Sequence, residues 1–221
     1  MNYKVILTGA TGMVGEGVLI ECLAHPQISE VLSVSRKSNG MSNPKLKEYI
    51  VPDFLNLKDD DKNLQGYDAC FFCAGVSSVG MKEAEYTRIT YDTTIHFAKV
   101  LLQQNPQMTF IYVSGASTDS TEKGKLMWAR VKGKTENTLA KMPFKKVYNF
   151  RPGFMKITPG QKNAVSAYKY FGWMYPFLKV VLPNSTSTLK QVALAMINCL
   201  IIGSDKQILE VRDINKLGKQ L

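Results

Sequence analysis

The turn that decides the fold lies near the start of the chain, where residues 8–15 read TGATGMVG. Its three glycines are spaced three residues apart and directly follow the apolar run of residues 5–7. Glycine lets a backbone turn tightly and approach a ligand, and the helix that opens after the turn presents free N–H groups to a phosphate. A strand, this turn and a helix in that order predict a dinucleotide site. The predicted contacts in the turn are Gly9, Thr11, Gly12, Met13, Val14 and Gly15.

Strand-like and helix-like segments alternate along the rest of the chain. Short apolar runs predict strands at residues 5–7, 31–34, 49–51, 70–74, 110–113, 146–150 and 208–211. Apolar residues at helical spacing predict helices at 14–23, 81–104 (in two pieces), 125–141 and 189–202. This alternation is typical of an α/β protein with a doubly wound parallel sheet of the Rossmann type. We expect a single domain over residues 1–221, with a small cap at about 154–188 above the strand ends.

Composition narrows the class of protein and its partners. The chain has 221 residues and a net charge of +10, with 18 Lys and Arg against 6 Asp and Glu in residues 111–221. This excess suits an anionic cofactor, and no nucleic-acid-binding motif accompanies it. No apolar stretch is long enough to span a membrane, and no secretory signal or metal site is predicted. We expect a cytoplasmic monomer or homodimer that contacts neither nucleic acid nor a membrane surface.

The pair Cys70 and Cys73 has the Cys-x-x-Cys spacing of redox and metal sites. The two cysteines lie in a predicted buried strand, where residues three apart point to opposite faces of the sheet. Thiols on opposite faces cannot form a disulfide, so the pair is interpreted as core packing.

The residues after the second predicted strand indicate which dinucleotide is bound. An NAD site normally places an acidic residue here, whereas an NADP site places arginine. The chain has Arg36 and Lys37, with no carboxylate between Glu30 and Glu48. A guanidinium can hold a ribose 2′-phosphate with two hydrogen bonds, and lysine adds a second positive charge. The sequence therefore favours NADP(H) over NAD(H), the alternative being that Arg36 is a solvated surface residue.

Five motifs together resemble the atypical and extended short-chain dehydrogenases. They are TGATGMVG, Asp53 after the third strand, Cys73-Ala74-Gly75 after the fourth, Ser114 after the fifth and Arg151-Pro152-Gly153 after the sixth. The resemblance is closest to the small NAD(P)-binding, epimerase-like subgroup that includes the human Tat-interacting-protein homologues, and it covers most of residues 1–155. It implies that Asp53 contacts the adenine amino group. The further cofactor contacts predicted are Phe54, Ala74, Gly75, Lys132, Arg151, Pro152 and Gly153.

The family's active centre combines a serine with Tyr-x-x-x-Lys on one helix. The lysine holds the ribose and lowers the tyrosine pKa, so that the phenol exchanges a proton with the substrate oxygen. Here Ser114 and Lys132 match, and Trp128 stands at the tyrosine position. An indole N–H donates a hydrogen bond but does not ionise in water. We take Ser114, Lys132 and Trp128 as the catalytic positions, with Tyr168, Tyr170, Tyr175 or Ser114 through water as substitute proton carriers.

Two functions remain open. The first is an oxidoreductase or epimerase-like enzyme acting on a small carbonyl or sugar-derived substrate with NADP(H). The second is a non-catalytic NADPH-binding regulator or scaffold that docks a protein partner. The segment 168–178, which is dense in aromatic residues, suits a substrate or partner pocket, a membrane contact, or ordinary packing.

Overall fold

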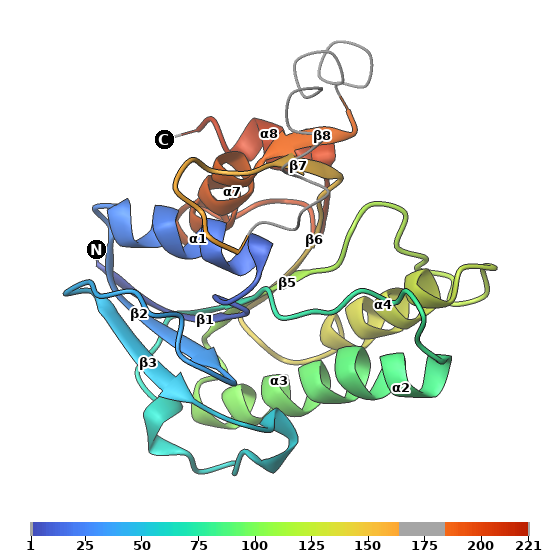
Figure 1. The fold of residues 1–221 in the computed structure, drawn as a ribbon, viewed down its shortest axis with the longest axis horizontal. Helices are drawn as coiled ribbons and strands as arrows, with labels where there is room; N and C mark the ends of the chain where they lie inside the picture. The colour runs from blue at the N-terminus through green and yellow to red at the C-terminus, as the bar shows by residue number, and fades with distance from the viewer. Residues whose placement is uncertain (1, 164–183, 221) are drawn as a thin grey trace.

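The computed structural model describes residues 2–163 and 184–220, and it is built around one parallel sheet (Figure 1). The order of the seven strands is β3-β2-β1-β4-β5-β6-β9. The strands are β1 (Tyr3–Thr8), β2 (Ile28–Ser35), β3 (Leu46–Ile50), β4 (Ala69–Phe72), β5 (Thr109–Val113), β6 (Lys146–Arg151) and β9 (Ile208–Glu210). Every neighbouring pair is parallel. The chain runs outward from β1 in both directions, so the strand order switches between β1 and β4, where ligands of such sheets bind.

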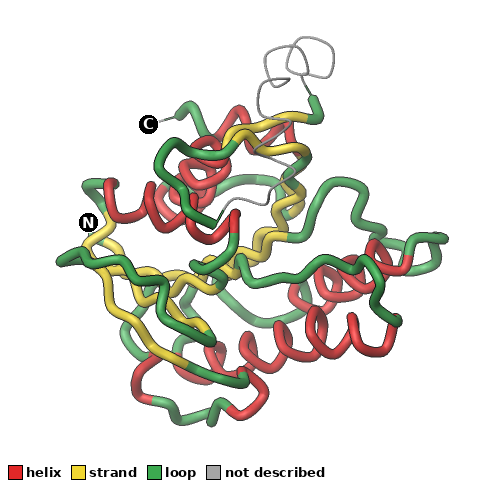
Figure 2. The backbone as a smooth tube through the Cα atoms, viewed as in Figure 1, coloured by secondary structure: helices red, strands yellow, loops and turns green. Residues whose placement is uncertain are grey.

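Helices cover both faces of this sheet (Figures 1 and 2). One face carries α1 (Met13–Ala24), α7 (Leu189–Ile201) and α8 (Val211–Leu217). The other carries α2 (Glu83–Thr87), α3 (Thr93–Gln104) and α4 (Met127–Leu139). The predicted Rossmann-type architecture is therefore confirmed.

The inner strands β1, β2, β4, β5 and β6 are mostly buried because their apolar side chains pack on both layers, whereas the edge strands β3 and β9 are partly exposed. Cys70 packs with the cluster on the α3 side, and Cys73 packs against the cluster on the α1 side. The two thiols therefore lie on opposite faces of the sheet, as predicted. Burial raises the pKa of both thiols, which keeps them in the unreactive protonated form.

The helical segment after β4 differs from its prediction. Residues 88–92 form a π-helical turn that connects α2 directly to α3, instead of a break between two helices. Such a turn inserts one extra residue into a helix without ending it, so the apolar spacing changes phase while the backbone stays helical. The last predicted strand is also one residue shorter, because Val211 begins α8.

The predicted cap region is described only at its two ends. There, β7 (Phe154–Lys156) and β8 (Thr186–Thr188) pair in parallel as a separate small sheet. Thr188 then begins α7 with a capping box, since its hydroxyl accepts the Gln191 N–H and the Gln191 side chain accepts in return. The prediction for residues 168–178, with Tyr168, Tyr170 and Tyr175, lies outside the described residues.

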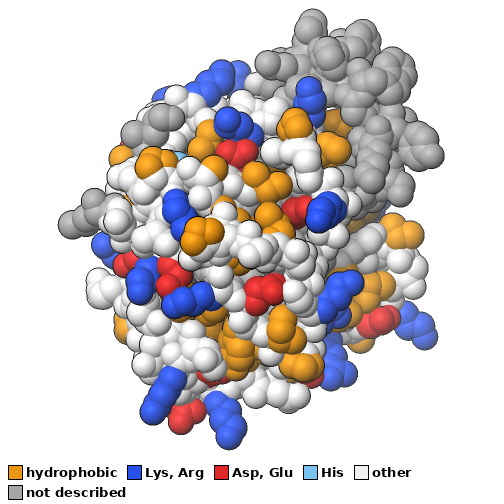
Figure 3. Space-filling model, turned by 60° about the vertical axis from the view of Figure 1, so that its left-hand side comes forward, with side chains coloured by type: hydrophobic (Ala, Val, Ile, Leu, Met, Phe, Trp, Pro, Cys, Tyr) orange, Lys and Arg blue, Asp and Glu red, His pale blue; other side chains and the backbone are white. Residues whose placement is uncertain are grey.

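Among residues 2–163 and 184–220, no helix is long and apolar enough to cross a membrane. On the face drawn in Figure 3, Lys and Arg side chains are interspersed with Asp and Glu. On that face the positive charge is therefore spread out and does not gather into one patch.

Candidate functional site

The glycine turn between β1 and α1 fits a phosphate. Gly9 has φ +76°, and a Cβ there would lie 2.7 Å from the backbone of Cys73 and Ala74. A Cβ on Gly15 would lie 2.1 Å from the Gly9 carbonyl oxygen. Gly12 is the N-cap of α1 and brings no side chain to the helix end, which leaves the first N–H groups open to an anion. The turn is thus a close-packed backbone loop that ends at the open N-terminus of α1.

Thr8 joins this turn to the loop after β4. Its buried hydroxyl accepts hydrogen bonds from the N–H groups of Cys73 and Ala74, both at 3.1 Å. Gly75 follows at an exposed position where an added Cβ would meet nothing within 4 Å. The carboxyl ends of β1 and β4 are therefore fixed against each other at the switch point, with open space beside Gly75.

The end of β2 presents its two basic residues to solvent. Arg36 and Lys37 are exposed, and the Ser35 hydroxyl donates to the Lys37 carbonyl at 2.7 Å, which fixes the turn. Neither side chain has an ion-pair partner among the described residues. Both cations are therefore available to an anionic ligand.

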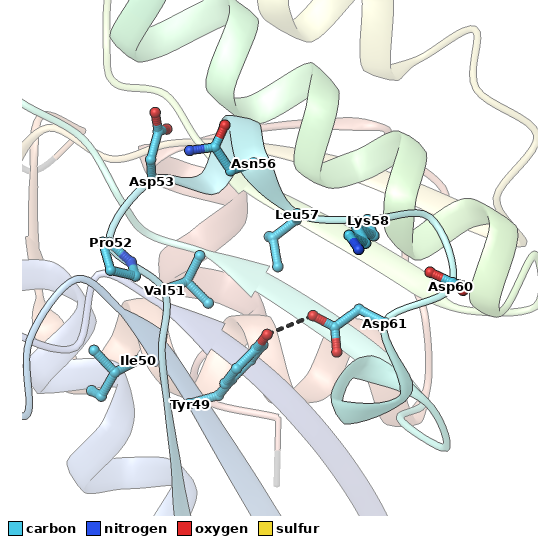
Figure 4. Close-up of a pocket in the computed structure, with 10 residues that line it drawn as sticks. All are labelled: Tyr49, Ile50, Val51, Pro52, Asp53, Asn56, Leu57, Lys58, Asp60 and Asp61. Atoms are coloured by element: carbon cyan, nitrogen blue, oxygen red, sulfur yellow. Dashed lines mark hydrogen bonds between the residues drawn. The ribbon is translucent and has the colours of Figure 1, made fainter.

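Asp53 lies at the rim of an open pocket of about 400 Å³ beyond β3 (Figure 4). Its carboxylate accepts the Leu55 N–H at 3.0 Å and caps a short 3₁₀ helix at residues 54–56. Phe54, predicted as a cofactor contact, instead packs its ring on Phe97 with centroids 5.2 Å apart. Because that side chain is buried in the core, only the backbone at residue 54 can face a ligand.

Two residues of the acidic run at positions 59–61, Asp60 and Asp61, line the same pocket. Asp61 accepts the Tyr49 hydroxyl at 2.5 Å (Figure 4) and the Asn63 N–H at 3.0 Å. It caps a 3₁₀ helix at residues 62–64. Among the described residues no three His, Cys, Asp or Glu side chains gather as metal ligands.

At the other end of the site, α4 carries Trp128 and Lys132 one turn apart. Lys132 Nζ donates a hydrogen bond to the Ser114 carbonyl, just beyond the end of β5. Burial lowers the pKa of Lys132 to about 8, and the negative charge of Glu136 opposes that shift. Trp128 is partly exposed and precedes Lys132 on the same face of the helix.

Ser114 is not arranged as the sequence predicts. Its hydroxyl is buried, donates to Glu136 Oε1 at 2.5 Å and lies 3.1 Å from the Phe150 carbonyl. The hydroxyl is thus committed to partners inside the protein. The cause is Glu136, whose carboxylate needs donors because it is 1% exposed.

Arg151 supplies the remaining donors. Its Nε and Nη2 donate to the two carboxylate oxygens of Glu136 at 3.0 and 2.5 Å, and the guanidinium also donates to Glu210 and Ser120. The guanidinium predicted as a cofactor contact is instead one half of a buried, two-pronged ion pair. Pairing with Glu136 raises the pKa of Arg151, so the positive charge is permanent.

Glu136 is the central residue that sequence reasoning missed. It lies four residues after Lys132, and its neighbours Val131, Thr135 and Leu139 on α4 are buried. The sequence signal for Glu136 was its position: it is an acidic residue on the buried side of an amphipathic helix, four residues after Lys132 and therefore beside it. Its partner, 15 residues away on β6, cannot be identified from spacing.

Pro152 and Gly153 follow β6 and help to hold the strand ends together. The Pro152 carbonyl accepts the Ala116 N–H at 2.9 Å, which ties the loops after β5 and β6. A Cβ on Gly153 would lie 2.2 Å from the Ser185 carbonyl oxygen, so the chain passes closely there. The structure thus brings the predicted residues to one edge of the sheet, with Phe54 and Arg151 turned inward.

Residues 5–126 match the sequence profile of the NAD dependent epimerase/dehydratase family. The chain is 25% identical to protein fmp52-1 of Aspergillus terreus, over 98% of this chain and 99% of that protein. It is also 25% identical to protein HTATIP2 of Rattus norvegicus, over 99% of this chain and 90% of that protein. The resemblance to short-chain dehydrogenases drawn from the five motifs is confirmed.

Among solved structures, the enzyme WbmF of Bordetella bronchiseptica in complex with NAD⁺ shares the fold. Its TM-score is 0.65 at 14% identity, with 99% of this chain and 78% of that chain covered. The agreement extends across the sheet and both helical layers.

The relatives correct one prediction. The matched protein from Aspergillus terreus is named a mitochondrial protein, as are further fmp52 proteins. That finding overturns the prediction of a cytoplasmic location, which rested only on the absence of targeting and membrane signals in the sequence.

Proposed function

The chain belongs to the NAD dependent epimerase/dehydratase family, and from this premise we propose that it binds NADP(H) and reduces a small carbonyl or sugar-derived substrate. A dinucleotide is the family's cofactor. The preference for NADP(H) is carried by one observation: Arg36 and Lys37 are exposed and unpaired by described residues at the end of β2.

Successive residues along the chain can be assigned to successive parts of the dinucleotide. The backbone of residues 9–15 would hold the pyrophosphate at the start of α1, and Arg36 would hold the ribose 2′-phosphate. Asp53, at the rim of the pocket beyond β3, lies where the adenine would end. Gly75, Pro152 and Gly153 would then lie toward the nicotinamide. A bound nicotinamide supplies or accepts a hydride, and the residues at that end hold the carbonyl beside it.

The variant Arg36→Asp tests the choice of cofactor. Losing a two-pronged charged contact and placing a carboxylate beside the 2′-phosphate should cost at least about 2 kcal/mol, or a thirtyfold rise in the NADPH Kd. NADH lacks that phosphate, so its Kd should change by less than about threefold. Fluorescence titration measures both values.

A matched control makes the same charge change far from the site, at the exposed Lys141 after α4. The variant Lys141→Asp should leave both Kd values within about twofold, because screening weakens distant surface charges. Equal losses of NADPH and NADH affinity in Arg36→Asp would refute the assignment to NADP(H).

Trp128 favours a second function, that of an NADPH-binding regulator without turnover. The family's proton-exchanging tyrosine is absent at this position, and the Ser114 hydroxyl is committed to Glu136. NADPH oxidation by the wild-type protein over a panel of aldehydes, ketones and sugar-derived carbonyls separates the two. Cofactor-dependent reduction of a carbonyl supports the enzyme, and tight NADPH binding with no reduction supports the regulator.

A further inference from the structure

The reaction end of the site has a proton carrier, although it lacks the tyrosine. Around the carboxyl ends of β5 and β6, the buried hydroxyls of Ser114 and Thr118 are committed within the protein, and the exposed Ser117 hydroxyl does not release a proton near neutral pH. Ser114 donates to Glu136, and Thr118 donates to the Gly115 carbonyl at 2.7 Å. Tyr112 is 1% exposed and burial raises its pKa further from neutrality. Lys132 is the described side chain here that both carries a proton and borders the open loop.

Its position suits proton transfer to a bound carbonyl. Nζ lies 4.0 Å from the Cβ position that a side chain at Gly115 would have. Gly115 has φ +150° and bears no side chain, so the amine is covered by bare backbone on that side. An ammonium has three donors, and the Ser114 carbonyl takes one of them. Two donors remain for a ligand.

We propose that Lys132 is the proton donor for carbonyl reduction in this protein, in place of the missing tyrosine. The proposal rests on the function proposed above. As the carbonyl carbon accepts a hydride from NADPH, which leaves as NADP⁺, Lys132 Nζ gives one proton to the carbonyl oxygen. The carbonyl π bond is replaced by one C–H and one O–H bond, and the neutral amine regains its proton from water.

The charges around Lys132 suit this role. Burial lowers the pKa of its ammonium to about 8, far enough to release a proton near neutral pH. Glu136 on α4 opposes that shift, and Arg151 on β6 neutralises Glu136 through their ion pair at 2.5 Å. The acid form predominates below pH 8. Reduction should therefore be fastest below about pH 8 and fall about tenfold per pH unit above it.

The variant Lys132→Arg tests the proposal directly. Arginine keeps the positive charge and hydrogen-bond donors but does not release a proton in this pH range. The NADPH Kd should stay within about threefold, while kcat for carbonyl reduction should fall by at least about a hundredfold. Lys134→Arg, at an exposed lysine on the same helix, is the matched control and should keep kcat within about twofold.

A second readout needs no turnover. Acetic anhydride labelling at a series of pH values, followed by peptide mass spectrometry, measures the fraction of Lys132 present as free amine. Half-maximal reactivity near pH 8 is expected, against about 10.4 for an ordinary lysine.

The outcomes separate the two claims. Carbonyl reduction that survives in Lys132→Arg, or an amine that titrates above pH 10 in an active protein, overturns the role of Lys132 and leaves the proposed reductase standing. Absence of reduction with every carbonyl, while NADPH still binds and Lys132 titrates near 8, overturns the reductase and this proton donor with it.

Discussion

The two ends of the site differ in whether backbone groups or side chains form them. At the cofactor end, around the start of α1, the structure relies on backbone: glycines that admit no Cβ and N–H groups held by Thr8. At the reaction end, between β5, α4 and β6, it relies on side chains, with Ser114 and Arg151 both turned onto Glu136.

This difference explains why one end follows the family pattern and the other departs from it. A backbone cradle depends on few residue identities, chiefly glycines at the positions where a Cβ would clash. Proton transfer depends on one ionisable side chain in one place, and at the position that the resemblance assigns to the family's tyrosine this chain has Trp128. Cofactor binding and turnover are therefore separate properties, and they can be tested separately.

The largest expected effect comes from removing the centre of the reaction end. Glu136→Ala leaves Arg151 buried without its main partner, although the half-exposed Glu210 still holds one nitrogen. The free energy of unfolding should fall by about 3 kcal/mol. Urea denaturation followed by circular dichroism measures it.

The double variant Glu136→Leu with Arg151→Met is the control, because it removes both charges and fills the space. It should regain at least half of the lost stability. If Glu136→Ala is as stable as the wild type, the buried ion pair does not hold the reaction end together.

At the cofactor end, Thr8→Val should have a smaller effect. Valine has nearly the same shape but leaves the N–H groups of Cys73 and Ala74 without their acceptor. The expected cost is about 2 kcal/mol in the free energy of unfolding, with weaker NADPH binding because the loops after β1 and β4 separate.

Thr93→Val is its matched control, since the Thr93 hydroxyl donates to the Arg88 carbonyl at an exposed place where water can substitute. That variant should change stability by less than about 0.5 kcal/mol. Equal costs for the two threonines would show that the Thr8 bridge has no special role.

The smallest effect, in free energy, is expected from Trp128→Tyr. Restoring an ionisable hydroxyl one turn before Lys132 should raise kcat/KM for carbonyl reduction about tenfold, or 1.4 kcal/mol. Trp128→Phe has no hydroxyl and should give no gain. A tyrosine variant no faster than the phenylalanine variant would show that residue 128 is not aimed at the substrate oxygen.

The sequence predicted the strand, glycine turn and helix of the cofactor end because its signals are local. The glycine turn, the cations after β2 and the strands between them are each visible within about ten residues. The π-helical turn at residues 88–92 was not predictable, since it changes helical phase without a breaking residue. The burial of the Phe54 ring was not predictable, since a residue beside a predicted contact can turn its side chain into the core.

The reaction end was only half predictable for a different physical reason. Ser114 and Lys132 were identified by their resemblance to the family's active centre, but the direction of the Ser114 hydroxyl depends on Glu136 and Arg151. These residues come together only when α4 packs on β5 and β6. A buried ion pair between separate elements leaves no periodic signal in the sequence.

The central claim is that the cofactor end binds NADP(H) whatever the reaction end does with it. Isothermal titration of the wild-type protein with NADPH, and separately with NADH, tests this most directly. We expect one NADPH per chain with a micromolar Kd, at least about tenfold tighter than NADH. Equal affinity for the two, or no binding of NADPH at millimolar concentration, would contradict the account.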